Sequence, residues 1–181
     1  IKEQWNKKRD TSAAAGTKMH YDIECYYNNI PVENTSTEYA FFKKFLQDFP
    51  DLKPYRTEWM IYHEDVKIAG SVDMVYENAD GTLEIYDWKR SKEITKVTNW
   101  NEYATNPLIK HLPSTNFWQY ALQLNTYKAI LERKYNKIVT KLCLVRLHPD
   151  NQENNYELLD VPILTKEIID LFEEREKQVS A

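Results

Sequence analysis

Glycine is scarce in this chain of 181 residues, which contains three in all, so neither the phosphate-binding loop G-x-x-x-x-G-K-[ST] nor the dinucleotide fingerprint G-x-G-x-x-G can be present. Two cysteines are too few for a four-thiolate zinc or iron–sulfur site. No apolar run approaches the roughly 18 residues of a membrane span, and no signal-peptide pattern occurs. We therefore expect an intracellular protein, neither secreted nor membrane-bound, in the cytoplasm or nucleus of a cell or of an infected host.

The rest of the composition is that of a globular domain, with 42% hydrophobic and 29% charged residues. The length suits one domain, and no linker or repeat divides it, so we expect a single domain over residues 1–181. The chain begins with Ile1, and we expect the natural N-terminus to lie upstream. A net charge of −4 gives no general attraction for polyanions, so any nucleic-acid binding needs a local patch or bound cations.

The spacing of apolar residues predicts helices over about 12–29, 36–49 and 117–134 and from 165 onward, and strands over about 55–62, 66–76, 83–89, 138–147 and 156–161. Thr11 or Ser12 offers an N-cap for the first helix, and Thr35 or Ser36 for the second. This order predicts an α/β (α+β) domain with a mixed central sheet flanked by helices. Residues 91–115 lack a steady period, and such a long segment in a small domain is more often functional than idle.

Two aspartates, Asp73 and Asp87, lie on successive predicted strands, and Lys89 follows two residues after Asp87. Because side chains alternate along a strand, Asp87 and Lys89 point to the same face. If the turn is a three-residue loop ending at Gly81, Asp73 lies directly opposite Asp87 and Ser71 opposite Lys89. A two-residue loop would place the aspartates on opposite faces. Facing carboxylates repel each other unless a cation lies between them, and oxygen ligands suit Mg²⁺ or Mn²⁺.

Polar residues on two predicted helices have both an ordinary and a functional interpretation. His20 and Glu24, four residues apart, form either a simple pair or part of a metal site, where imidazole favours Mn²⁺ over Mg²⁺. Gln123 and Tyr127 share the same spacing and either face solvent or hold a phosphate or a base in a cleft. The two aspartates and the lysine could likewise be ordinary polar residues at strand ends.

Four short motifs stand in a fixed order: Gly16-Thr17-Lys18-Met19-His20, Gly70-Ser71-Val72-Asp73, Asp87-Trp88-Lys89 and Gln123-Leu124-Asn125-Thr126-Tyr127. This order resembles the RecB-like branch of the PD-(D/E)XK nuclease superfamily, which includes recombination exonucleases and many viral or phage proteins. The resemblance implies a restriction-endonuclease-like core. The chain departs from the branch in lacking a proline before Asp73, and it lacks the cysteine quartet of the iron–sulfur members, so no cluster is expected.

The resemblance also implies roles for individual residues. Mg²⁺ or Mn²⁺ would be bound by His20, Asp73, Asp87 and the backbone carbonyl of Trp88, and Lys89 would act with the two aspartates in catalysis. We place four further residues in a second tier of the site: Glu24, Glu58, Gln123 and Tyr127.

The long segment 91–115 and its flanks carry basic and aromatic residues that suit a nucleic-acid strand. Basic residues could follow the phosphates, and aromatic rings could stack on unpaired bases. The alternative is a lid that is simply solvated. The candidates are Arg90, Lys92, Lys96, Lys110, Trp100 and Trp118.

Together these features predict a Mg²⁺- or Mn²⁺-dependent deoxyribonuclease, an exonuclease rather than an endonuclease. It would act on DNA ends or single strands in replication, repair or recombination, with any partner protein unknown. One alternative is an RNA endonuclease of the cap-snatching type. Another is a non-catalytic nucleic-acid-binding subunit on the same fold.

Overall fold

A computed structural model describes residues 2–181, apart from the side chains of Lys2 and Trp5; Ile1, and with it the expected upstream N-terminus, lies outside the described residues. No described helix combines the length and apolar character needed to cross a membrane. The elements in chain order are α1 (Lys2–Tyr27), α2 (Thr37–Asp48), β1 (Lys53–His63), β2 (Ile68–Glu77), β3 (Leu83–Lys89), η1 (Pro107–Ile109), α3 (Asn116–Lys134), β4 (Val139–Arg146), β5 (Glu157–Asp160) and α4 (Thr165–Ser180).

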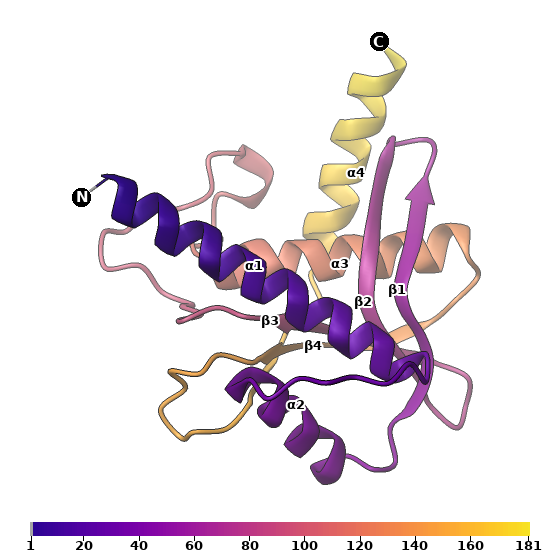
Figure 1. The fold of residues 1–181 in the computed structure, drawn as a ribbon. Helices are drawn as coiled ribbons and strands as arrows, with labels where there is room; N and C mark the ends of the chain where they lie inside the picture. The colour runs from indigo at the N-terminus through magenta and orange to yellow at the C-terminus, as the bar shows by residue number, and fades with distance from the viewer. Residues whose placement is uncertain (1) are drawn as a thin grey trace.

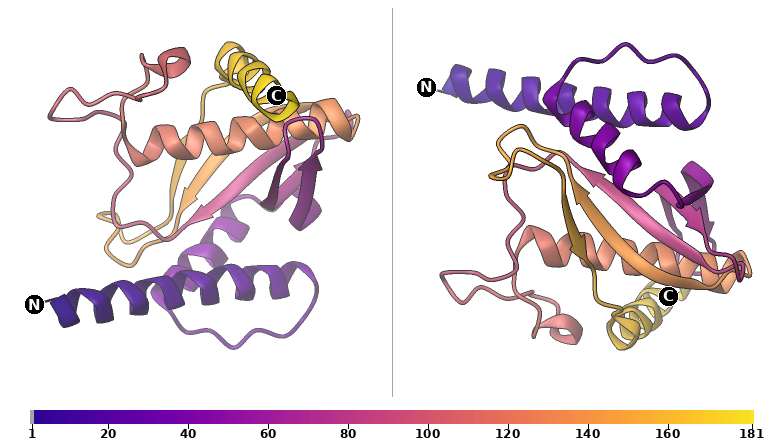
Figure 2. Two further views of the ribbon diagram at one scale, coloured as in Figure 1. Left: turned by 90° about the horizontal axis from the view of Figure 1, so that it is seen from above. Right: turned by 90° about the horizontal axis from the view of Figure 1, so that it is seen from below.

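The described residues form three layers, with one sheet between two pairs of helices (Figures 1 and 2). The five strands lie in the order β1-β2-β3-β4-β5, and β3 and β4 run parallel while the other neighbours are antiparallel. Helix α3 makes the crossover between the parallel strands. The mixed sheet and the order of helices and strands are those predicted from the sequence.

Two hydrophobic clusters hold the layers together, one on each face of the sheet. On β3 the residues alternate between them: Leu83 and Ile85 belong to the cluster shared with α3 and α4, while Tyr86 and Trp88 belong to the cluster shared with α1 and α2. Strand β3 lies between β2 and β4, with α1 on one face of the sheet and α3 on the other. Polar side chains at the end of β3 therefore lie close to both helices.

Helix α1 begins well before the predicted start at Thr11 or Ser12. It already includes Lys2, and the Thr11 hydroxyl donates to the carbonyl of Lys7 at 2.8 Å within the helix. Residues 2–10 contain Lys, Glu, Gln and Arg, which favour helix, and no glycine or proline. The described side chains of this half are exposed, so no apolar period marks it in the sequence. The predicted cap of the second helix is confirmed, since Ser36 accepts from the N–H of Tyr39 at 3.3 Å.

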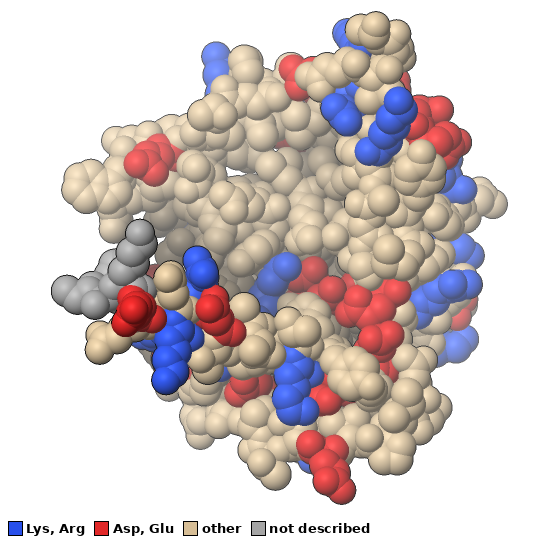
Figure 3. Space-filling model, turned by 45° about the horizontal axis from the view of Figure 1, so that its top comes forward, with Lys and Arg blue, Asp and Glu red and all other residues tan. Residues whose placement is uncertain are grey.

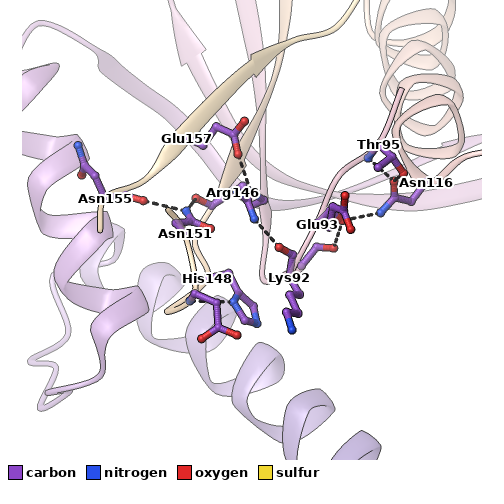
Figure 4. A network of polar contacts seen from close by, with 11 residues as sticks. Lys92, Glu93, Thr95, Asn116, Arg146, His148, Asn151, Asn155 and Glu157 are labelled. Atoms are coloured by element: carbon purple, nitrogen blue, oxygen red, sulfur yellow. Dashed lines mark hydrogen bonds and ion pairs between the residues drawn. The ribbon is translucent and has the colours of Figure 1, made fainter. Parts of the chain in front are cut away.

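A polar network anchors the start of the long segment 91–115 (Figure 4). Arg146, at the end of β4, donates to the carbonyl of Lys92 at 2.6 Å and pairs with Glu157 at 2.6 Å. Asn116, in the first turn of α3, donates to the carbonyl of Glu93 at 2.8 Å and accepts from the N–H of Thr95 at 2.9 Å. The segment therefore leaves β3 along a fixed path, although it has little regular structure of its own.

The later part of this segment rests on α4. Asn106 donates to Glu174 at 2.9 Å, and His111 pairs with Glu167 at 2.8 Å. Between these anchors and the network at the start, Trp100 is 83% exposed. The tip of the segment, around Trp100, is therefore free of these anchoring contacts.

Candidate metal centre

The two aspartates lie where β2 and β3 part. The ladder between these strands ends at the pair Met74 and Tyr86, and Asp73 and Asp87 are the next residues on each strand. Beyond this fork β2 continues to pair with β1, and β3 with β4. Asp73 accepts a hydrogen bond from the backbone N–H of Trp88 at 3.0 Å, so one carboxylate bridges the opening between the strands.

The three-residue loop that sets this register is confirmed. The N–H of Asn78 donates to the carbonyl of Thr82 at 2.8 Å, and Gly81 adopts a φ of 82°, which favours glycine. The predicted pairing of Ser71 with Lys89 is wrong, because β2 has left β3 by that point and Ser71 pairs with Met60 of β1. The length of the turn predicts the register of the β2–β3 pairing, but it does not predict where along the strands that pairing ends.

Lys89 lies within reach of Asp87 and of helix α3. Its ammonium is 2.7 Å from Oδ2 of Asp87 and donates to the Gln123 amide oxygen at 3.2 Å. It also lies 4.3 Å from the centre of the Tyr120 ring, in a cation–π contact. The side chain is 17% exposed, so the charge is held at one place by three contacts and still reaches the surface.

Tyr127 completes this side of the site. Its hydroxyl accepts from the Gln123 amide at 2.9 Å, and its ring lies against Gly70 of β2. A Cβ at position 70 would lie 2.5 Å from Cε1 of Tyr127, so the lack of a side chain at Gly70 permits the approach of α3 to β2. The structure therefore places Gln123 beside Lys89 and Tyr127 beside Gly70, while their roles in the site stay predictions.

His20 approaches the aspartates from the other side of the fork. Met19 and Ile23 are buried in the cluster with α2 and fix this turn of α1. The imidazole Nδ1 lies 3.5 Å from Oδ2 of Asp73 and 3.9 Å from Oε1 of Glu58. One ligand atom from each of these three residues lies within 4.8 Å of the others.

The site disfavours ionisation of the two aspartates, and the pKa of each is raised. Burial, followed by the charge of Asp87, raises the pKa of Asp73 to about 7. Burial raises the pKa of Asp87 too, against the opposing effect of Lys89. Two buried carboxyl groups side by side are unfavourable when both are ionised, and a cation between them relieves that repulsion.

The basic groups respond to the same carboxylates. Burial alone would lower the pKa of Lys89, but Asp87 more than offsets it and the pKa is raised. Burial likewise opposes protonation of His20, while the neighbouring Glu58 carboxylate and the charges of both aspartates raise its pKa. Carboxylate oxygens with one imidazole nitrogen are a donor set that fits a divalent cation such as Mn²⁺ or Mg²⁺. Binding would displace protons from these groups.

Other predicted site residues lie apart from this cluster or remain predictions. Glu24 is half-buried one turn along α1 and does not belong to the group formed by His20. Trp88 contributes its N–H to Asp73, while a role for its carbonyl stays a prediction. Arg90 forms a mostly buried ion pair with Glu38 at 2.7 Å, which occupies its guanidinium.

The predicted nucleic-acid residues of the long segment are mostly exposed. Lys92, Lys96, Lys110 and Trp100 are open to solvent, and Trp118 is half-buried with its indole N–H donating to the carbonyl of Lys96 at 3.0 Å. Figure 3 shows a hollow between α1 and the lobe formed by this segment; the wall on the side of the lobe is mostly uncharged, whereas Lys, Arg, Asp and Glu side chains line the α1 side.

Sequence reasoning missed two residues that the structure places against the site. Tyr120 lies one turn before Gln123 on α3, a spacing that could have indicated it. Ser71 donates to Oε2 of Glu58 at 2.9 Å. Glu58 was placed in the second tier of the site from the sequence, but its left-handed backbone, with a φ of 46°, was not predicted.

Comparisons with known proteins bear on this site. The model of one protein family, described as the PD-(D/E)XK nuclease superfamily, matches residues 5–180. No curated protein matches the chain. Among solved structures, one described as a putative exonuclease from Eubacterium rectale is similar at a TM-score of 0.42 and 11% identity, over 87% of this chain and 70% of that one.

Proposed function

The chain belongs to the PD-(D/E)XK nuclease superfamily, and we propose that it is a divalent-metal-dependent DNA exonuclease acting on DNA ends or single strands. The observation that carries this proposal is the fork of β2 and β3, where Asp73, Asp87 and Lys89 meet. The mixed sheet flanked on both faces by helices agrees with the restriction-endonuclease-like core predicted from the sequence.

Asp73, Asp87 and His20 are the residues that would hold the metal, with the carbonyl of Trp88 as a further candidate. A divalent cation there would supply a water of lowered pKa and positive charge beside the scissile phosphate. The positive charge of the cation would also attract a phosphate locally, which the protein as a whole, with a net charge of −4, does not do.

Lys89 is the residue that acts on the reacting atoms in this proposal. Its ammonium is fixed between Asp87, Gln123 and the Tyr120 ring. From there it orients the attacking water and stabilises the negative charge that develops on the phosphate oxygens as the new P–O bond forms and the bond to the leaving sugar oxygen breaks. A charge held in place in advance needs little reorganisation at the moment of reaction.

The exposed tip of the long segment favours single-stranded DNA, or a frayed end of duplex DNA, as the substrate. Trp100 can stack on an unpaired base, while Lys92 and Lys96 lie nearby in the chain for the phosphates. Lys110 and Trp118 remain candidates, whereas Arg90 is taken up by Glu38. Replication, repair or recombination is the proposed setting.

The experiment is a digest of end-labelled single- and double-stranded DNA, and of RNA, with Mn²⁺, Mg²⁺ or a chelator. We expect DNA cleavage with metal and none with chelator. Asp87→Ala and Lys89→Ala should each reduce the rate by about a hundredfold or more, as for other removed electrostatic groups. Lys53→Ala, at an exposed ion pair with Glu77, is the matched control and should keep full activity.

Three outcomes would contradict the proposal. Full activity of Asp87→Ala or Lys89→Ala would show that the replaced residue does not have the proposed role. Full activity of the wild type with chelator would show that no metal is needed. Cleavage of RNA but not DNA would favour the cap-snatching alternative. Binding of DNA without metal-dependent turnover would favour the non-catalytic subunit.

A further inference from the structure

We propose that the exposed first half of α1, residues 2–14, is an arm that binds the phosphate backbone of the DNA strand held at the fork, through Lys8 and Arg9. The inference rests on the proposed function, because it takes the substrate to be DNA. It concerns binding alone, which can be measured with chelator and without cleavage. The predicted nucleic-acid residues belong to the long segment 91–115 and its flanks, so the arm is a second contact surface across the hollow of Figure 3.

This half of α1 forms no hydrogen bond or ion pair with another element among the described residues. The buried side chains of the helix lie within residues 19–25, whereas every described side chain from residue 3 to residue 14 is exposed. The polar contacts of the arm, such as the pair between Arg9 and Asp10 at 3.2 Å, stay within the helix. That pair is 74% and 68% exposed, and such pairs contribute little stability, so a phosphate can replace the aspartate.

The charge of the arm indicates the kind of partner. Residues 1–12 contain four basic and two acidic residues, a net charge of +2, which leaves −6 of the total of −4 for residues 13–181. Lys7, Lys8 and Arg9 are consecutive and exposed. This local positive charge attracts a polyanion that the rest of the protein repels. The described side chains of the arm are polar or small, so they give no apolar face for a membrane.

The two basic residues continue the faces of α1 that meet the rest of the protein. Arg9 precedes His20 by eleven residues, which is about three helical turns, so both residues lie on the same face of the helix. Lys8 precedes the buried Met19 by the same interval. At 1.5 Å per residue, Arg9 lies about 16 Å from His20 along the helix, which is about five nucleotide steps at the 3.4 Å rise of a DNA strand. A strand that leaves the fork along α1 therefore reaches the arm.

The face between Arg9 and His20 is low and open. The residues one and two turns before His20 on this face are Gly16 and Ala13, which project little from the helix. A glycine inside a helix costs stability relative to alanine. A Cβ at position 16 would meet no neighbour within 4 Å, so the packing of the described residues does not require glycine there. The space above Gly16 lets a strand approach α1 closely between the fork and the arm.

The test measures binding of a fluorescent single-stranded DNA to the full chain by anisotropy, with chelator and over a range of salt concentrations. The double variant Lys8→Gln with Arg9→Gln keeps residues that favour helix. We expect its affinity to be about tenfold lower at low salt, and the slope of log K against log salt to be smaller by about 1.4, as for two lost phosphate contacts. The matched control is Lys43→Gln with Lys44→Gln, which removes two consecutive exposed lysines from α2 and should leave the affinity within about twofold and the slope unchanged.

A further variant tests the path of the strand along α1. In Gly16→Leu the new residue favours helix and its Cβ meets open space, so the protein should melt at the wild-type temperature or above. Its side chain projects into the space of the strand, so DNA affinity should fall severalfold. Wild-type affinity in this variant would overturn the proposed path.

The remaining outcomes separate the arm from the nuclease proposal. Wild-type affinity in Lys8→Gln with Arg9→Gln, or an equal loss in the Lys43 and Lys44 control, would overturn the arm. So would a wild type that binds vesicles of phosphatidylcholine and phosphatidylserine but not DNA. Loss of DNA binding in the arm variant, with no cleavage by the wild type, would support the arm and reject the proposed function. Metal-dependent cleavage with normal binding by the arm variant would reject the arm alone.

Discussion

Asp73 stabilises contacts across the fork and at the same time carries a charge that the fold accommodates poorly. Its carboxylate accepts from the N–H of Trp88, and its backbone carbonyl accepts from the hydroxyl of Thr57 at 3.0 Å. Burial, then the neighbouring Asp87, raises its pKa from 3.8 to about 7. The folded state therefore holds this proton more tightly than the unfolded state, and stability is lost as the pH rises between those two values.

Removing the charge of Asp73 should stabilise the metal-free protein. Asp73→Asn keeps an acceptor for Trp88 and stays neutral, so at about pH 8 with chelator we expect a gain of roughly 1–3 kcal/mol in the free energy of unfolding by urea. The gain should shrink as the pH falls and vanish below about pH 3, where Asp73 is protonated in both states. Added Mn²⁺ should stabilise the wild type and not the variant.

Asp51→Asn serves as a control for this change, since Asp51 is exposed between α2 and β1 and its replacement should alter stability little at either pH. A metal-free Asp73→Asn protein that is less stable than the wild type at about pH 8 would mean that the carboxylate contacts outweigh the repulsion.

The contact between β2 and α3 depends on the absence of a side chain at Gly70. The added Cβ of Gly70→Ala would lie 2.5 Å from the Tyr127 ring and 3.2 Å from its hydroxyl oxygen, so the ring must move away from Gln123. Because Gln123 also holds Lys89, the displacement should reach the proposed catalytic group. We expect a loss of about 1–3 kcal/mol in stability, as for other overpacked cores, together with reduced cleavage.

A double-mutant cycle checks this contact. Tyr127→Ala alone leaves a space beside position 70, and in that background Gly70→Ala should cost little further stability. Equal costs of Gly70→Ala in both backgrounds would show that the Tyr127 contact is not the cause. Urea unfolding of the four proteins gives the coupling directly.

The sequence predicted those elements whose signals are local and missed those that depend on packing. Gly81 and the apolar alternation of β3 fixed the hairpin register, because loop length and strand period leave few options. No pattern in the sequence marks the early end of the β2–β3 ladder or the left-handed backbone at Glu58.

The candidate site residues show the same difference between local signals, which the sequence contains, and long-range contacts, which it does not. Asp73, Asp87, Lys89 and Gln123 were found because strand and helix periods place them on common faces, and the structure brings them together. Arg90 was assigned to nucleic acid from its position in a basic stretch, but its partner Glu38 lies 52 residues away in the chain on α2, a distance over which periodicity carries no information.

At the scale of the whole molecule, His63 connects the β1–β2 hairpin to the two helices on that face. It is 2% exposed, its ring meets Phe172 of α4 edge to face at 5.6 Å, and its Nδ1 has no hydrogen-bond partner among the described residues. Burial lowers its pKa, and the charge of Lys134, which pairs with Glu64 and Asp65, lowers it further. A neutral, packed imidazole at this junction makes overall stability sensitive to acid.

We expect stability to fall as the pH drops below 6.5, because the unfolded state then takes up a proton on His63 that the folded state resists. His63→Phe keeps an aromatic ring against Phe172 and cannot titrate, so its loss of stability between about pH 8 and pH 5 should be smaller than that of the wild type by about 1 kcal/mol. Any packing cost of the substitution is present at both pH values and cancels in this difference. His148, whose pKa is also lowered, chiefly by burial, remains in both proteins, so part of the acid sensitivity should persist. Urea unfolding with chelator at the two pH values measures both quantities, and identical pH dependence in wild type and variant would show that His63 is protonated as readily in the fold as in the unfolded chain.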